Sequence, residues 1–184
     1  MSTIGFGPQS YRLAFCIANR PPIDDYPVLD QLRPLAPAEI DYIVSNTSNH
    51  WRKVFNVYAK FLFELRGDQN VVSTWQNYRD RHLLQAGSDE ALLFNAPMFS
   101  SHSDEIVHVI AGKTYATALK LPFSLTWIDS YFAINVEYRV IVSPYLDYRQ
   151  LSNERISILV RLVKSLLARD ATSCVQVSVK PCYE

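Results

Sequence analysis

The loop after a short apolar run at residues 139–142 is rich in side chains that can bind or transform a ligand. It contains Tyr145, Asp147, Tyr148 and Arg149. A carboxylate can act as a base, a guanidinium can hold a carboxylate or phosphate through two parallel hydrogen bonds, and a phenol ring can stack on a flat ligand. The sequence therefore predicts a catalytic role for Asp147 and a ligand-binding role for Tyr145, Tyr148 and Arg149.

Two more side chains would join this loop if the strands before them run parallel to the 139–142 strand. Asn95 ends a predicted strand at 91–95, and Lys113 follows another at 105–110. Ligands of open α/β sheets sit beyond the carboxyl ends of parallel strands. We therefore expect Asn95 to orient a water molecule and Lys113, at a predicted helix start, to contact an anion.

The structural alternative for the same loop is an ion pair that only stiffens it. Asp147 and Arg149 would bind each other, and both tyrosines would pack at the base of the loop. Convergence of Tyr145, Tyr148 and Arg149 on an open pocket would favour a ligand-binding domain, whereas a loop packed shut would favour a protein-interaction domain.

Several well-known site patterns are missing from the chain. The four histidines have no zinc-ligand spacing, so neither a metal nor a cofactor is predicted. Residues 111–114 read Ala-Gly-Lys-Thr, but Val107 stands where a phosphate-binding loop needs its first glycine. No Gly-x-Ser-x-Gly or Gly-x-Gly-x-x-Gly motif is present. Any catalysis is therefore expected to be hydrolytic, with Asn95 or Asp147 orienting water.

The helices that must position these loops are predicted from apolar spacing. A helix from Ser48 carries apolar residues every three or four positions until Gly67 stops it. Ser152 is a suitable N-cap for the last helix, because Leu151 and Ile156 have the spacing of a hydrophobic staple. Further helices are predicted at 37–44 (with Pro37 as its first residue), at 72–84 and at 113–120.

The strands are predicted from short apolar or alternating runs. They are expected at 11–17, 91–95, 105–110, 139–142 and 174–179, and residues 123–128 are expected to form a strand or an extended segment. Strands that alternate with helices favour a single three-layer α/β domain with a short, mostly parallel central sheet and extra N-terminal helices. In this scheme residues 1–88 hold a strand, a proline-rich loop at 18–37 and helices, and residues 89–184 form the sheet and the ligand cleft.

Composition limits the classes of partner and compartment. The 18 basic and 18 acidic residues cancel, so net charge does not support binding to nucleic acid. Residues 139–169 nevertheless carry six basic side chains against two acidic ones, which indicates either an anion-facing edge or a solvated helix face. The absence of a signal peptide and of a long apolar stretch, together with three widely spaced cysteines, predicts a cytoplasmic protein without a membrane partner.

The second half of the chain weakly resembles the uracil-DNA glycosylase-like fold, a central parallel sheet flanked by helices. ALLFNAPMF (91–99) is similar to the water-handling motif of that fold, and RVIVSPYLDYR (139–149) to its groove loop. The strand and helix at 108–119 would lie between them. The resemblance implies that Asn95 stands at the water-activating position and Ser143-Pro144 at the groove loop, where Ser143 replaces the family's histidine. The whole chain also resembles a small uncharacterised bacterial family, which implies no activity.

Two functions remain open from the sequence. The first is a binding domain for a nucleobase, a nucleotide or another small anionic ring compound, with at most hydrolytic chemistry. The second is a non-enzymatic protein-interaction domain whose cleft has degenerated. The sequence does not indicate an oligomeric state.

Overall fold

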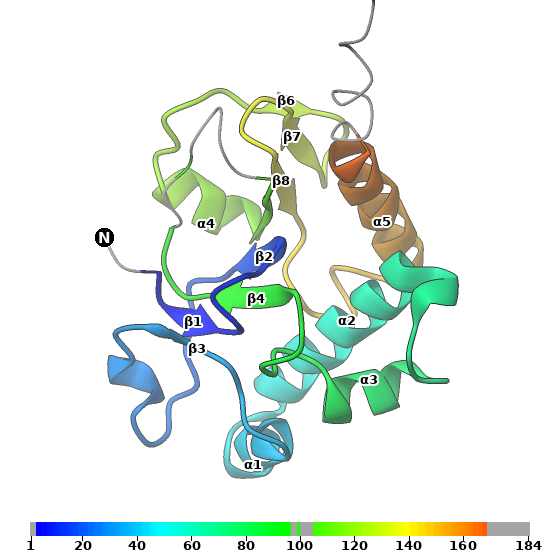
Figure 1. Cartoon of the computed structure of the whole chain (residues 1–184). Helices are drawn as coiled ribbons and strands as arrows, with labels where there is room; N and C mark the ends of the chain where they lie inside the picture. The colour runs from blue at the N-terminus through cyan, green and yellow to red at the C-terminus, as the bar shows by residue number, and fades with distance from the viewer. Residues whose placement is uncertain (1–2, 97–98, 100–104, 169–184) are drawn as a thin grey trace, which may run out of the picture.

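The computed structural model describes residues 3–96, 99 and 105–168, and these residues form one eight-stranded sheet (Figure 1). The strands lie in the order β3-β1-β4-β2-β5-β8-β7-β6. Their bounds are β1 (Gly5–Phe6), β2 (Leu13–Cys16), β3 (Leu32–Arg33), β4 (Glu90–Leu93), β5 (Val107–Ala111), β6 (Thr126–Trp127), β7 (Ala133–Asn135) and β8 (Val140–Ser143). The predicted strand at 174–179 lies outside the described residues.

The four central strands, β4, β2, β5 and β8, are parallel to one another. Each is a run of four or five residues that are buried throughout. Continuous burial is typical of parallel strands covered on both faces. The short strands β1, β7 and β6 add antiparallel pairs at the two sides of this centre. The predicted mostly parallel sheet is therefore confirmed.

Five α-helices and two short 3₁₀ turns accompany the sheet in the described part of the chain. Their bounds are η1 (Tyr26–Val28), α1 (Glu39–Asn46), α2 (Asn49–Arg66), η2 (Gly67–Gln69), α3 (Trp75–Arg81), α4 (Lys113–Ala118) and α5 (Asn153–Leu167). The expected starts of α2 and α5 are confirmed, because Ser48 and Ser152 are their N-caps. Gly67 ends α2 with a φ of 52°, and its N–H bonds to the carbonyl of Phe63.

Apolar side chains gather in two clusters, because successive residues of a strand point to opposite faces of the sheet. Phe15 and Val109 belong to the larger cluster, which includes the buried residues of α2 and α5. Cys16 and Ile110, their neighbours in sequence, belong to the smaller cluster with Ala116 of α4. Figure 1 shows α2 and α5 on one side of the central strands and α4 on the other.

Several predicted bounds are wrong. The helix predicted at 37–44 begins at Glu39, because Ala38 is its N-cap with a φ of 66°, so Pro37 lies outside it. The helix predicted at 72–84 is shortened to α3, where Thr74 caps the N-terminus and accepts a hydrogen bond from the Asn77 N–H. The strand or extended segment predicted at 123–128 contains only the two residues of β6. The sequence reading missed β1, β3 and β7.

Candidate functional site

The carboxyl ends of β5 and β8 open onto a pocket of about 300 Å³, which we call the Arg149 pocket. The turn from β5 into α4 forms one wall, and the loop after β8 forms another. The third wall comes from the turn between β6 and β7. The residues that line the pocket are Gly112, Lys113, Ser130, Tyr131, Ser143, Pro144, Arg149, Gln150 and Arg155.

A backbone hydrogen bond joins the first two walls, and a side-chain hydrogen bond fixes the start of the second. Gly112 adopts a φ of 106°, a conformation that side-chain-bearing residues rarely adopt, and its N–H bonds to the Ser143 carbonyl at 2.8 Å. The Ser143 hydroxyl donates to the carbonyl of Pro144 at 2.9 Å. The Ser143 hydroxyl is therefore engaged with the loop backbone.

The Arg149 pocket is positively charged. Lys113, Arg149 and Arg155 line it, and no aspartate or glutamate belongs to its lining within the described residues. All three cations lie beside rings. Lys113 Nζ is 4.4 Å from the centre of Trp127, and Arg155 Cζ is 3.6 Å from that of Tyr131. Arg149 Cζ is 5.7 Å from the centre of Tyr148. A ring face holds a cation without cancelling its charge. The arrangement is therefore suited to an anion.

Asp147 belongs to the loop after β8 but does not line the Arg149 pocket; its side chain contacts Lys53 of α2. Its Oδ2 accepts a hydrogen bond from Lys53 Nζ at 2.8 Å, and its Oδ1 accepts one from the backbone N–H of Arg149 at 2.9 Å. Partial burial acts to raise the pKa of Asp147, but these two bonds outweigh it and lower the pKa. The carboxylate is thus ionised, and both of its oxygens are engaged. Its ion-pair partner is Lys53, whereas the structural alternative expected Arg149.

Tyr145 forms a polar cluster with His50 and Asn19. The Tyr145 hydroxyl lies 3.1 Å from His50 Nε2 and accepts a longer bond of 3.4 Å from Asn19 Nδ2. The rings of Tyr145 and His50 are stacked, with centres 5.5 Å apart. Burial lowers the pKa of His50 and raises that of Tyr145, so both groups favour their neutral forms. A neutral histidine and a neutral phenol can exchange donor and acceptor roles.

The structure brings only two of the six predicted site residues into one pocket. Lys113 and Arg149 both line the Arg149 pocket, whereas Tyr148 lines a separate pocket beside α2. Asn95 Oδ1 accepts a hydrogen bond from the N–H of Ile4 at 2.9 Å, which ties the chain before β1 to the end of β4. The predicted catalytic roles of Asn95 and Asp147 stay predictions.

Two important pocket residues were not among the predicted ones. Arg155 lies three positions after the N-cap Ser152, inside the basic stretch at 139–169 that the sequence did indicate. Tyr131 lies in the turn between β6 and β7, where Asp129 Oδ1 accepts hydrogen bonds from the N–H groups of Tyr131 and Phe132, each at 2.7 Å. An aspartate that bonds the backbone two residues later is a turn signal. Asp129 is therefore the sequence signal that indicates the turn between β6 and β7.

Metal-ligand clusters and membrane-crossing helices are both absent from the described residues. Within 3–96, 99 and 105–168, no group of three or more His, Cys, Asp or Glu side chains is arranged to hold a metal ion. In the same ranges, the length and apolarity that a membrane-crossing helix requires are not met by any helix.

Comparison with known proteins gives a family but no activity. No curated protein and no solved structure matches the chain, so the resemblance to the uracil-DNA glycosylase-like fold is not confirmed. A model of a family of unknown function (DUF6942) matches residues 4–164, which covers nearly all of the described fold. The chain therefore belongs to this family of unknown function (DUF6942).

Proposed function

We propose that this protein binds a small anionic ligand in the Arg149 pocket, and that the ligand is a nucleotide, a nucleobase derivative or another small anionic ring compound. The observation that carries the proposal is the convergence of Lys113, Arg149 and Arg155 on one pocket whose described lining has no carboxylate. Three such cations repel one another when the pocket is empty, and a phosphate or carboxylate relieves that repulsion. The two guanidinium groups can also hold an anion through paired hydrogen bonds.

The size and the remaining side chains of the pocket narrow the ligand class. A volume of about 300 Å³ lies at the lower end of small-molecule sites, so it suits a phosphate with one sugar or one ring. Ser130, Tyr131 and Gln150 add hydroxyl and amide groups that can donate to or accept from ring substituents. These groups favour a polar heterocycle over a purely aliphatic anion.

Binding without chemistry is the form of the proposal that the geometry supports best. Hydrolysis assisted by Asp147 would require its carboxylate to orient water, but both oxygens already accept hydrogen bonds from Lys53 and from the Arg149 backbone. Asn95 would likewise have to release the N–H of Ile4 from its oxygen or act through its amide nitrogen. Catalysis by either residue is thus a separate hypothesis.

The proposal includes two broader expectations. One is a three-layer α/β domain, supported by two apolar clusters that use alternate residues of the central strands. The other is a cytoplasmic location, which is supported by a sequence with three widely spaced cysteines.

A thermal-shift comparison tests the binding proposal. The probes are inorganic phosphate, ribose 5-phosphate, uracil, uridine monophosphate and adenosine monophosphate. A ligand at 100 times its Kd adds about 2.7 kcal/mol to the free energy of unfolding. For a chain of this length that raises the Tm by about 5–10 °C.

Matched arginine variants show whether the ligand that raises the Tm is bound in the Arg149 pocket. Arg149→Ala and Arg155→Ala should abolish the shift, whereas Arg161→Ala, an exposed arginine elsewhere on α5, should keep it. A shift that survives in both pocket variants would place the ligand elsewhere. If none of the anions shifts the Tm, the Arg149 pocket is not the site of such a ligand.

The second candidate function is a non-enzymatic protein-interaction domain. A groove along α2, separate from the Arg149 pocket, favours it.

A further inference from the structure

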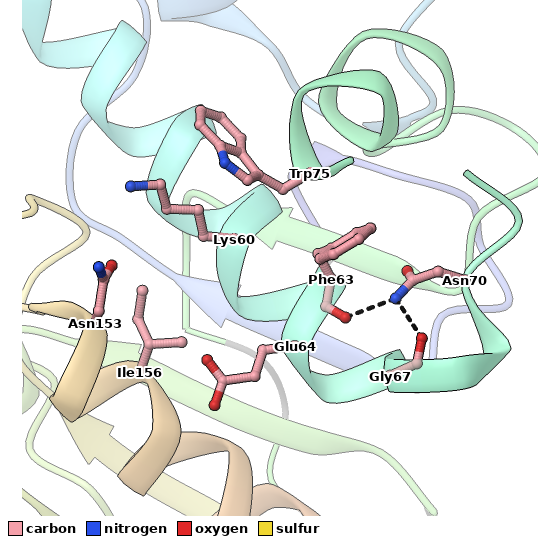
Figure 2. A pocket seen from close by; sticks show the side chains of 8 residues that line it. All are labelled: Lys60, Phe63, Glu64, Gly67, Asn70, Trp75, Asn153 and Ile156. Carbon is pink, nitrogen blue, oxygen red and sulfur yellow. Dashed lines mark hydrogen bonds between the residues drawn. The ribbon is translucent and has the colours of Figure 1, made fainter. Parts of the chain in front are cut away.

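Two adjoining pockets form a groove along α2, and Lys60 lines both of them. The first, which we call the basic pocket, has a volume of about 410 Å³ and lies between α2, α3 and Tyr148 of the loop after β8. The second, the apolar pocket, has a volume of about 620 Å³ and lies between α2, α3 and the start of α5 (Figure 2). Together they make up the α2 groove.

The apolar pocket is built from side chains of three helices. Phe63 of α2, Trp75 of α3 and Ile156 of α5 line it, as Figure 2 shows. The turn that closes its end is fixed by Asn70, whose Nδ2 donates to the carbonyls of Phe63 and Gly67 at 2.7 Å each. Because this end is fixed, the apolar surface is preorganised and an apolar group can enter it at low entropic cost.

Trp75 stands at the junction of the two pockets, between two cations. Lys60 Nζ lies 5.1 Å and Arg79 Cζ 5.8 Å from the centre of its ring. Arg79 is further held by Asn56, whose Oδ1 accepts from its Nη1 at 2.6 Å. Positive charge and apolar surface therefore meet at one fixed point of the groove.

The basic pocket carries more positive than negative charge. Arg52, Lys53, Lys60 and Arg79 line it. Lys53 is paired with Asp147, and Arg79 is paired with Asp80 at 2.7 Å. Arg52 and Lys60 form no ion pair within the part of the chain that the structure describes, so two positive charges are left without a carboxylate partner.

We propose that the α2 groove binds an acidic peptide segment of a partner protein, with carboxylates against Arg52 and Lys60 and an aliphatic or aromatic side chain in the apolar pocket. The charge of the basic pocket is complementary to carboxylates, which gives orientation and a fast association. The apolar pocket offers the kind of buried anchor point that carries most of the energy at protein interfaces.

A continuous polyanion fits the groove less well than such a peptide. Glu64 lines the apolar pocket, and its carboxylate repels a phosphate that follows the groove beyond Lys60. A single-stranded nucleic acid would therefore use only the basic half. An acidic segment followed by an apolar residue uses both halves.

The α2 groove is distinct from the Arg149 pocket, although they share a loop. Tyr148 lines the basic pocket, and the next residue, Arg149, lines the other. Lys113 belongs to the Arg149 pocket alone, so a variant of Lys113 separates the two proposals.

Fluorescence anisotropy with defined peptides tests the inference. The probe is a fluorescein-labelled synthetic peptide with four consecutive glutamates, two glycines and a Leu-Phe pair. Arg52→Glu should weaken its binding about tenfold, because a like charge replaces an attractive one. Arg161→Glu, an equally exposed arginine of α5 outside the groove, should leave binding unchanged. Lys113→Ala should also leave it unchanged, even if the small-anion proposal fails.

Changes in the peptide test the apolar half without altering the protein. Replacing Leu-Phe with Ser-Ser should weaken binding about tenfold, since the anchor is lost. The proposal is overturned if the peptide does not bind, if the Ser-Ser peptide binds equally well, or if Arg52→Glu and Arg161→Glu behave alike. It is also overturned if oligothymidylate binds through Arg52 and the peptide does not, because the groove would then be a nucleic-acid site.

Discussion

Glu90, the first residue of β4, is fully buried, and its replacement by glutamine should change how the stability of the protein depends on pH. The Tyr78 hydroxyl donates to both carboxylate oxygens at 3.0 Å, and the N–H of Leu84 donates to Oε1 at 3.1 Å. Arg66 Nη2 lies 2.9 Å from Oε2. Burial raises the pKa of Glu90 to about 7, although Arg66 acts in the opposite direction.

The size of the effect follows from the difference between the folded and unfolded pKa. Between pH 4.5 and pH 7 the unfolded chain has lost the Glu90 proton and the folded chain still holds it. Stability from this group is therefore greatest below pH 4.5 and falls as the pH rises to 7. At 1.36 kcal/mol for each pKa unit, the loss amounts to about 3 kcal/mol. Glu90→Gln cannot ionise and lacks this loss.

Urea unfolding followed by tryptophan fluorescence measures the effect at a series of pH values. The difference in the free energy of unfolding, wild type minus Glu90→Gln, should fall by about 3 kcal/mol between pH 4.5 and pH 7. Taking the difference cancels the contributions of other titrating groups such as His50 and Asp147. A difference that is independent of pH would refute the reasoning. It would mean that the ion pair with Arg66 keeps Glu90 ionised in the folded protein.

Four further substitutions, at three positions, test other contacts by the same urea assay. Asp147→Ala should cost about 1–2 kcal/mol, because it removes an ion pair and a backbone acceptor. Asp147→Asn should cost less, since its oxygen can still accept from the Arg149 N–H, and equal losses would contradict the role of that bond. Tyr58→Phe should cost about 1 kcal/mol, because the buried hydroxyl donates to the Ala91 carbonyl at 2.7 Å; an unchanged stability would contradict this. Gly112→Ala should cost about 1–3 kcal/mol from its φ of 106°, and a neutral result would show that the turn can relax.

The parts of the fold that the sequence predicts well are those with a local signal. The apolar stripe of α2 and the N-cap Ser152 of α5 are set by neighbouring residues, and both predictions are confirmed. The short strands β1 and β3 have no such signal, because each has only two residues. β3 pairs with β1, and β1 pairs in turn with β4.

A contact with the following strand also explains why the helix predicted at 72–84 ends early. The N–H of Leu84 donates a hydrogen bond to the buried carboxylate of Glu90, and Leu84 itself adopts a φ of 61°. A residue in that conformation cannot continue a helix. The apolar spacing of residues 72–84 does not indicate that a carboxylate of the following strand will accept this hydrogen bond.

In the candidate site too, the residues predicted correctly are those with a local sequence signal, and the others depend on contacts distant in sequence. The rule that ligands lie beyond the carboxyl ends of parallel strands selected Lys113 and Arg149, which do line one pocket. The directions of Tyr145 and Asp147 depend on His50 and Lys53, which are 95 and 94 positions away in the chain. Nothing in the loop sequence reveals those partners. The sequence therefore could not predict that Arg149 lines the Arg149 pocket while Tyr145 and Asp147 contact residues of α2.

The position of β2 at the centre of the sheet has a consequence for the order in which the protein can fold during synthesis. Leu13 pairs with Glu90 on one side and with Val107 on the other, so β2 has no partner within the first 89 residues. At a translation rate of 5–20 residues per second, about 4–15 s pass between the synthesis of the four apolar residues of β2 and that of β4, the first of these strands. Helices α2 and α3 are adjacent in sequence and in contact with each other, so we expect this pair to form in that interval. Folding of this chain is therefore expected to start from its helices, with the sheet completed last and at a slow rate set by distant pairing.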